Sequence, residues 1–286
     1  AGAAGAAAAT AKVAKADVIK TIFPQTVLGA NEIIRTGHIG LGGMGRADLG
    51  FTLGRDDMQP IALCDLWYKN LGRGEDMLKQ KFPGKYTTHH DFRELVTRKD
   101  IDAVICATPD HWHALVAIDA MRNGKDVYVE KPLTLTIREG RALVAAARKY
   151  NRVAQHGTQH RSMKRFHDVA EFVRNDGLGK LDRIECFIPP NNRHCGATWQ
   201  PEPVPAGLDW DMWLGPSPWR PYTSIGCHYN FRFIGDNAYG QVTNWGAHYL
   251  DIGQWALDKE DSGPVEVEGH GEFPSSGLFT DRKSVV

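Results

Sequence analysis

A glycine-rich turn that follows a short apolar stretch constrains the fold of this 286-residue chain more than any other feature. The turn runs from Gly40 to Gly45 with the spacing G-x-G-x-x-G, and Gly42 is its second glycine. A second apolar run, 61–64, ends in Asp65, 20 residues after Gly45. This order of strand, glycine turn, helix, strand and acidic residue is typical of a dinucleotide-binding unit.

Each part of such a unit has a physical task. The glycines allow a tight turn and a close approach of backbone to a pyrophosphate, and the helix N-terminus offers unpaired N–H groups to the phosphates. A carboxylate at Asp65 accepts hydrogen bonds from ribose hydroxyls and favours NAD over NADP. NADP remains an alternative because Arg46 could bind its 2′-phosphate. The alternative is a purely structural strand–turn–helix. The expected cofactor contacts here are Gly40, Gly42, Gly43, Met44, Gly45 and Asp65.

Composition narrows the class of protein. Lys+Arg and Asp+Glu both number 34, so bulk charge does not favour a nucleic-acid partner, and no apolar run reaches the ~20 residues of a membrane span. The five cysteines are scattered without zinc-ligand spacing, so we predict no metal site. The Ala-rich first ten residues favour the tail of an export signal, and hence a periplasmic location, over a disordered leader in the cytoplasm.

Short apolar stretches alternate with helical stretches up to about residue 156, which predicts a parallel, doubly wound sheet. The expected strands are 33–39, 60–64, 85–87, 101–107, 126–129 and 152–155, and the expected helices are 44–54, 67–81, 91–98, 111–122 and 137–150. We therefore assign 1–32 to a leader or arm, 33–156 to a dinucleotide-binding domain, and 157–286 to an α/β domain for substrate binding and oligomerisation.

The pattern changes after residue 157. Segment 189–221 holds eight of the 15 prolines and four of the eight tryptophans, which suits either stacking on a sugar ring or the packing of a long loop. The strands expected here are too few for a complete second sheet, so the C-terminal domain is expected to be short or truncated. The elements expected in this part are helices 161–175 and 241–257 and strands 181–188 and 265–269.

Two further motifs follow predicted central strands, at the edge where open α/β sheets bind ligands. In the first, Thr108 and Pro109 begin a turn, and His113 falls in the first turn of the next helix. Its alternative is a plain strand–helix connection. The second is Glu130-Lys131-Pro132, where proline holds the Lys131 backbone extended and can direct its amine into the cleft. Its alternative is a surface lysine in a salt bridge.

The fourth motif lies on the helix predicted at 241–257. Asn244, His248 and Asp251 share one face of that helix beside an apolar stripe, so they need partners or a ligand. Histidine titrates near neutral pH and suits general acid–base work. The alternative is a hydrogen-bonded core histidine.

Together these four motifs resemble the glucose–fructose oxidoreductase, inositol dehydrogenase and rhizopine-catabolism (Gfo/Idh/MocA) family over roughly residues 33–270. The resemblance implies a Rossmann domain followed by an α/β domain with an open, mostly antiparallel sheet. Segment 208–216 resembles the exported, sugar-oxidising branch. Two positions depart from the family pattern: Asp110 stands for an asparagine and Asn244 for an aspartate. The substitution at Asn244 leaves His248, backed by Asp251, as the expected base.

The resemblance implies an NAD(P)-dependent oxidoreductase that moves a hydride between nicotinamide and a hydroxyl of a sugar, glycoside or cyclic polyol. Lys131, His248 and Asn244 are the expected catalytic residues, and Thr108, Pro109, His113, Glu130 and Lys131 the further cofactor contacts. Two alternatives remain, an NAD-dependent glycoside hydrolase and a non-catalytic NAD-binding regulator. A homo-oligomer, dimer or tetramer, is expected. The candidate substrate contacts are His160, Arg161, Arg232 and Asp251.

Overall fold

The computed structural model describes residues 33–188, 199–272 and 283–285. Its larger part is a six-stranded parallel sheet in the order β3-β2-β1-β4-β5-β6, so the expected doubly wound sheet is confirmed. The winding reverses between the central strands β1 and β4. The strands are β1 (Ile34–Ile39), β2 (Met58–Cys64), β3 (Thr87–His89), β4 (Ala103–Cys106), β5 (Asp126–Glu130) and β6 (Ala154–Gly157).

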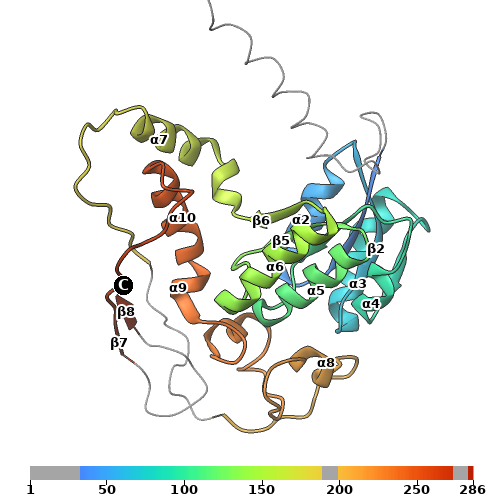
Figure 1. The fold of residues 1–286 in the computed structure, drawn as a ribbon. Coiled ribbons are helices and arrows are strands. Elements are labelled where there is room, and N and C mark those ends of the chain that lie inside the picture. The colour runs from blue at the N-terminus through green and yellow to red at the C-terminus, as the bar shows by residue number, and fades with distance from the viewer. Residues whose placement is uncertain (1–32, 189–198, 273–282, 286) are drawn as a thin grey trace, which may run out of the picture.

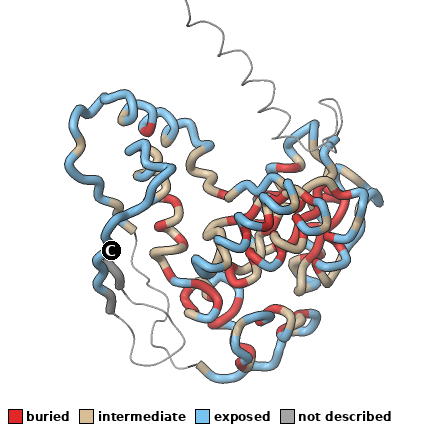
Figure 2. The backbone as a smooth tube through the Cα atoms, viewed as in Figure 1, coloured by how far each residue is buried: buried red, intermediate tan, exposed pale blue. Residues whose placement is uncertain are grey.

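Helices cover both faces of this sheet, and each face has its own apolar core. One core is leucine-rich and includes Leu41, Leu49 and Leu78, and the other is larger and includes Val104 and Met121. Buried residues accordingly concentrate in this part of the chain (Figure 2). The helices are α2 (Gly43–Leu53), α3 (Tyr68–Lys81), α4 (Phe92–Val96), α5 (Asp110–Arg122) and α6 (Ile137–Tyr150).

Local sequence accounts for the ends of α6. Thr136 accepts a hydrogen bond from the Glu139 N–H while the Glu139 carboxylate accepts the Thr136 N–H, which forms a capping box. Asn151 ends the helix in the left-handed conformation, with φ at 52°. The helix thereby returns the chain to β6, whose last residue lies beside the end of β5 in the sheet.

Most of the remaining described helices form an arm beside the sheet (Figure 1). The arm contains the 3₁₀ helix η1 (Gln159–Ser162), α7 (Lys164–Arg174), α9 (Gly240–Asn244) and α10 (Gly246–Ala256). The single helix expected at 241–257 is thus two helices that meet at Trp245, although hydrogen bonds continue across the joint. No helix in the described ranges combines the length and the apolar character that a bilayer crossing requires.

Two predicted strands of the second domain are corrected by the structure. Segment 181–188 is irregular, and it packs on α10 through the Cys186 thiol, which donates to the Tyr249 carbonyl at 3.5 Å. A strand needs a neighbouring ladder, and the described residues provide none here. Segment 265–269 is also irregular, and the antiparallel pair is formed instead by β7 (His270–Glu272) and β8 (Lys283–Val285). The predicted leader, 1–32, lies outside the described residues.

Segment 207–237, here named the covering segment, returns from the arm to the sheet. It contains α8 (Trp210–Leu214) and the 3₁₀ helix η2 (His228–Phe233). The Trp210 and Trp213 rings stack with centroids 4.8 Å apart, and the buried Arg220 guanidinium lies over Trp210 at 5.1 Å. This cluster gives the covering segment a small core of its own. Trp210 and Trp213 therefore pack the core of this loop, and Trp213 also reaches the surface of a pocket.

Candidate active site

The glycine turn after β1 has a geometry that only glycine satisfies at two positions. Gly40 has φ of +85°, and a Cβ there would lie 2.6 Å from the Ala107 carbonyl oxygen. A Cβ on Gly45 would lie 1.8 Å from the Gly40 carbonyl oxygen. At Gly42 and Gly43 an added Cβ meets nothing within 4 Å, so the start of α2 faces open space. An open helix N-terminus of this kind fits a pyrophosphate.

Asp65 ties the turn to the end of β2. One carboxylate oxygen accepts the Leu41 N–H at 2.7 Å and the other accepts the Trp67 N–H at 2.8 Å. Burial raises the pKa of Asp65, and these backbone bonds oppose that rise. Each carboxylate oxygen has a second acceptor site, so the side chain is held in place and can still accept a ribose hydroxyl. Arg46 donates to the Leu41 carbonyl at 2.7 Å.

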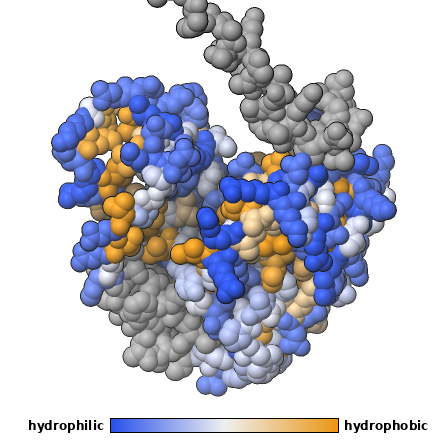
Figure 3. Space-filling view, in the orientation of Figure 1, coloured by the Kyte–Doolittle hydropathy of each residue, from blue (hydrophilic) through white to orange (hydrophobic). Residues whose placement is uncertain are grey.

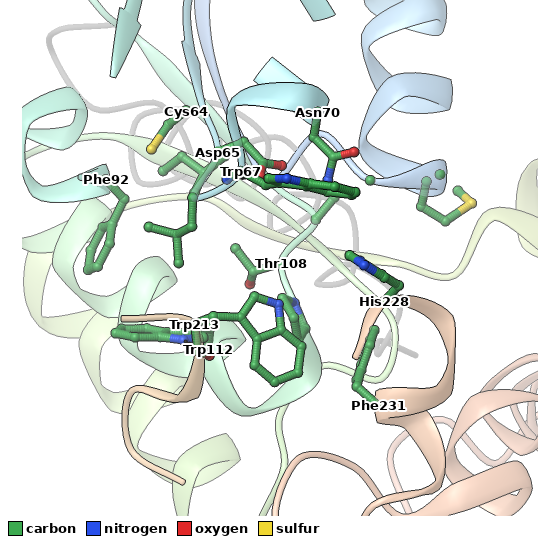
Figure 4. Close-up of a pocket in the computed structure, with 18 of the residues that line it drawn as sticks. Cys64, Asp65, Trp67, Asn70, Phe92, Thr108, Trp112, Trp213, His228 and Phe231 are labelled. Carbon is green, nitrogen blue, oxygen red and sulfur yellow. Dashed lines mark hydrogen bonds between the residues drawn. The ribbon is translucent and has the colours of Figure 1, made fainter. Parts of the chain in front are cut away.

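A pocket of about 570 Å³ opens in front of the turn. Trp67 lies on one side of it, Trp112 and Trp213 lie on the opposite side, and Thr108 projects between them (Figure 4). Most of the lining is apolar or aromatic, as in the pockets that enclose the bases of bound nucleotides. The polar lining includes Gly42 backbone and Asp65, so the pocket joins a phosphate position to a ribose position.

The covering segment forms the outer wall of this pocket, a feature that the sequence did not predict. The Tyr68 N–H donates to the Gly207 carbonyl, and the Asp209 N–H donates to the Leu66 carbonyl, both at 3.0 Å. The Trp213 carbonyl accepts the side-chain N–H groups of His111 and Trp112 at 2.9 and 3.1 Å. These contacts cross more than 100 residues of sequence, which is why local patterns give no signal for them. The covering segment adds Leu208, Met212, Trp213, His228, Tyr229, Phe231 and Arg232 to the lining.

The predicted catalytic lysine lies at the edge of the sheet where β5 ends. Lys131 precedes a cis proline, Pro132, and its amine donates to the Asn244 side-chain oxygen at 2.8 Å. The Asn244 amide in turn donates to Gln241 at 3.2 Å. The structure therefore brings Lys131 and the predicted helix together across 113 residues of sequence.

Charges around Lys131 are balanced within a mostly buried group of side chains. Burial lowers the pKa of Lys131 and the Arg232 charge lowers it further, while Glu130 and Asp110 oppose this. Burial raises the pKa of Asp110 to about 7 despite the charges of Arg232 and Lys131. The Glu130 carboxylate accepts the Lys131 N–H and the Tyr128 hydroxyl, both at 3.3 Å. Glu130 is buried beneath the sheet edge and does not line the pocket.

His248 lies one turn after Asn244 and is buried. Burial and the nearby Lys131 charge lower the pKa of His248 to about 4, so the ring is neutral at physiological pH. Its Nδ1 has no hydrogen-bond partner among the described residues, and its ring stacks on His160 at 4.1 Å. A neutral, unpaired imidazole beside a lysine can accept a proton from a substrate hydroxyl.

His113 has a different environment from the one expected. Its two ring nitrogens lie 2.7 Å from the Pro132 carbonyl oxygen and 2.9 Å from the Thr108 carbonyl oxygen. Burial lowers its pKa to about 4, and a neutral ring has one N–H, so one of the two contacts is a hydrogen bond in each tautomer. His113 thus connects the loops after β4 and β5 and does not line the pocket.

Two predicted substrate residues bind each other. Arg161 donates two hydrogen bonds to the Asp251 carboxylate, each 2.7 Å long, and also pairs with Glu260. This ion pair joins η1 to α10 and leaves Asp251 without a hydrogen bond to His248. Arg232 lines the pocket, where its guanidinium lies over the Phe231 ring at 4.5 Å.

Most of the predicted site residues therefore form two neighbouring groups, and Gly45, His113 and Glu130 lie in neither. The first lines the cofactor pocket and comprises Gly40, Gly42, Gly43, Met44, Asp65, Thr108, Pro109 and Arg232. The second surrounds Lys131 on the arm side and comprises Asn244, His248 and His160 with the Arg161–Asp251 pair. His156, at the end of β6, belongs to this second group and was missed. The sequence offered a signal for it, because His156 directly follows the strand predicted at 152–155, next to the one that leads to Lys131.

Comparisons with known proteins agree with this fold. Residues 34–158 match the family model GFO_IDH_MocA, described as an oxidoreductase family with an NAD-binding Rossmann fold. Residues 193–275 match the model of the C-terminal α/β domain of the same family. The solved structure of GenD2 from gentamicin A biosynthesis, in complex with NAD, superposes with a TM-score of 0.57 at 18% identity, over 80% of this chain and 54% of that chain. This likeness shows a shared fold.

Two curated bacterial relatives match part of the chain. An alpha-N-acetylgalactosaminidase of Shewanella oneidensis is 40% identical over 112 residues, which are 38% of this chain and 24% of that protein. A glycosyl hydrolase family 109 protein of Shewanella baltica is 34% identical over 152 residues, which are 49% of this chain and 33% of that protein. The chain thus matches a third or less of the length of these two relatives.

Proposed function

Because the chain belongs to the Gfo/Idh/MocA family of oxidoreductases, whose N-terminal domain binds NAD, we propose that it oxidises a hydroxyl of a sugar, glycoside or cyclic polyol. The observation that carries this proposal is the 2.8 Å contact between the Lys131 amine and the Asn244 side chain. This contact places Lys131 one helical turn from His248, at the edge of the sheet that borders the cofactor pocket.

The proposed roles follow from the environment of each side chain. Bound NAD supplies a nicotinamide ring that accepts a hydride from the carbon that bears the reacting hydroxyl. The open start of α2 and Asp65 hold the pyrophosphate and the ribose, and Asp65 favours NAD over NADP. Lys131 donates a hydrogen bond to the substrate oxygen, and the neutral His248 accepts the hydroxyl proton.

The test is a reduction screen of NAD⁺ and NADP⁺ over monosaccharides, glycosides and inositols. Lys131→Met keeps the packing volume and removes the amine, so we expect it to lower kcat by about 10²- to 10⁴-fold on the best substrate. The exposed Lys99→Met is the matched control and should behave as the wild type. Unchanged turnover in Lys131→Met would refute the catalytic assignment and leave the non-catalytic regulator as the better hypothesis.

A second candidate function is favoured by the Shewanella relatives, which are named as a glycosidase and a glycosyl hydrolase. The same site would then oxidise a glycoside transiently, eliminate the aglycone and return the hydride. Incubation with 4-nitrophenyl glycosides in the presence of NAD⁺ separates the two functions. Release of nitrophenol without net NADH supports glycoside cleavage, and accumulation of NADH without release supports the dehydrogenase.

We also propose that the chain forms a homo-oligomer, a dimer or a tetramer, through the arm. Apolar side chains gather on the surface of this part of the molecule (Figure 3). Val169 and Phe172 on α7 are more than half exposed, and Phe187 is 81% exposed. Large apolar side chains that are exposed in this way are typical of an interface when they gather on one surface. Light scattering coupled to size exclusion measures the mass, and a monomer at all concentrations would contradict this proposal.

A further inference from the structure

The predicted base, His248, is the end member of a stack of three rings. The Phe166 and His160 rings lie 4.6 Å apart with an interplanar angle of 11°, and the His160 and His248 rings lie 4.1 Å apart at 21°. We propose that His160 is a positioning residue that holds the plane of the His248 imidazole by stacking, and that it does not bind the substrate itself. This inference rests on the proposed role of His248 in proton transfer.

Hydrogen bonds do not hold the His248 ring in the described structure. The Nδ1 atoms of His248 and His160 are both buried and have no hydrogen-bond partner among the described residues. The edge of the Trp245 ring approaches His248 with a centroid distance of 5.8 Å, and the His160 face covers the ring closely. Ring orientation at His248 therefore depends on aromatic contacts, and the stacked one with His160 is the shorter.

His160 is itself held firmly from its own side of the site. The adjacent residue, Arg161, binds the Asp251 carboxylate through two hydrogen bonds of 2.7 Å. Asp251 lies on α10, one turn after His248. Two adjacent residues of η1 thus contact two residues of α10 that are one turn apart: His160 stacks on His248, and Arg161 pairs with Asp251. The ion pair fixes the position of η1 against α10. Phe166, at the start of α7, closes the outer face of the His160 ring.

The charges around the stack favour a neutral His248. Burial lowers the pKa of His248, and Lys131, His160 and His156 lower it further, while Asp251 raises it. The pKa of His160 is also lowered, first by burial and then by Arg165 and Lys131, again against Asp251. Two imidazolium rings stacked at this distance would repel each other, so the pair resists a second proton. The three histidines do not converge in a metal-binding geometry within the described ranges.

The experiment compares His160→Phe, which keeps a flat ring, with His160→Ala, which removes it, in the full chain. His167→Phe is the matched control, because His167 is an exposed histidine on α7 outside the stack. Two measurements are made. The first gives kcat and KM as a function of pH on the best substrate, and the second follows the His248 titration by NMR of its ring protons. The NMR titration needs no turnover, so it reports on the stack even if the proposed oxidation fails.

We expect His160→Ala to lower kcat about tenfold and to change KM little. A tenfold loss of rate corresponds to the free energy of about one aromatic contact. His160→Phe should restore kcat to within about threefold of the wild type, because it retains the stack. Both variants remove an ionisable neighbour whose charge lowers the pKa of His248, so the His248 titration and the acid limb of kcat should move to higher pH in both. The His167→Phe control should change neither quantity.

Two results would overturn the inference, and a third would separate it from the proposed function. Equal losses of kcat in both variants would mean that the imidazole itself contacts the substrate. An unchanged His248 titration in His160→Ala would mean that the two rings do not interact in solution. If the wild type oxidises no substrate but its His248 titration shifts as expected in both variants, the proposed function fails and the stacking contact stands.

Discussion

At the scale of single residues, Asn244 determines how Lys131 is partnered. The amine donates to a neutral amide oxygen at 2.8 Å, and no carboxylate among the described residues is hydrogen-bonded to it. Burial and the Arg232 charge lower the pKa of Lys131, with Glu130 and Asp110 opposing them. Asp110 and Asn244 are the two positions that depart from the family pattern. The negative charge near the lysine therefore comes from Glu130 at the end of β5 and Asp110 at the start of α5.

Asn244→Asp places a carboxylate in contact with the Lys131 amine. The new anion stabilises the charged amine and raises its pKa, so the inflection of log kcat against pH that belongs to Lys131 should move to higher pH. The matched control is Asn175→Asp, at an exposed position that follows α7. An inflection that stays in place in Asn244→Asp would show that the Lys131–Asn244 contact does not persist during turnover.

At the scale of elements, the sequence predicts best where each element is specified locally. The parallel sheet, the glycine turn and the position of Lys131 after β5 follow from short patterns, because strand periodicity and glycine spacing are local properties. The prediction of a strand at 181–188 is wrong, because strand formation depends on pairing with a second strand that is distant in the sequence. The stack of His160 on His248 cannot be predicted from the sequence either, because it depends on how η1 packs against α10.

Helix α2 contains a buried acid that supports a prediction about stability. Asp48 is 7% exposed, one of its carboxylate oxygens has no partner among the described residues, and burial with the nearby Glu130 raises its pKa to about 7. An acid with a raised native pKa costs no stability below its unfolded pKa of 3.8, and the cost grows as pH rises to about 7. Asp48→Asn removes that cost.

We therefore expect Asp48→Asn to stabilise the protein on the order of 2 kcal/mol at pH 8 and to have little effect at pH 4. Urea unfolding at the two pH values measures the difference. Asp56→Asn, at an exposed position after α2, controls for the loss of a surface charge. Equal stabilisation by Asp48→Asn at both pH values would mean that packing, and not ionisation, is responsible.

At the scale of the whole molecule, Asn237 connects the covering segment to the sheet domain. Its amide donates to His111 Nδ1 at 3.3 Å and to the Ser217 hydroxyl at 2.8 Å, and its oxygen accepts from Arg220 at 2.6 Å. His111 then donates from Nε2 to the Trp213 carbonyl at the pocket wall. A continuous chain of hydrogen bonds thus runs from the core of the covering segment to α5.

Asn237→Ala interrupts this chain at its centre and leaves Arg220, whose Nε and Nη1 already lack partners in the described structure, with one bond fewer. The covering segment should then detach more easily from α5, and the pocket wall around Trp213 should open. We expect the Kd for NAD to rise about tenfold or more, because leaving buried polar groups unpaired costs about 1–3 kcal/mol. Isothermal titration of NAD⁺ measures the Kd, and the exposed Asn175→Ala is the control. If Asn237→Ala lowers the unfolding midpoint but binds NAD⁺ as tightly as the wild type, the hydrogen-bond chain supports folding alone and the covering segment does not retain the cofactor.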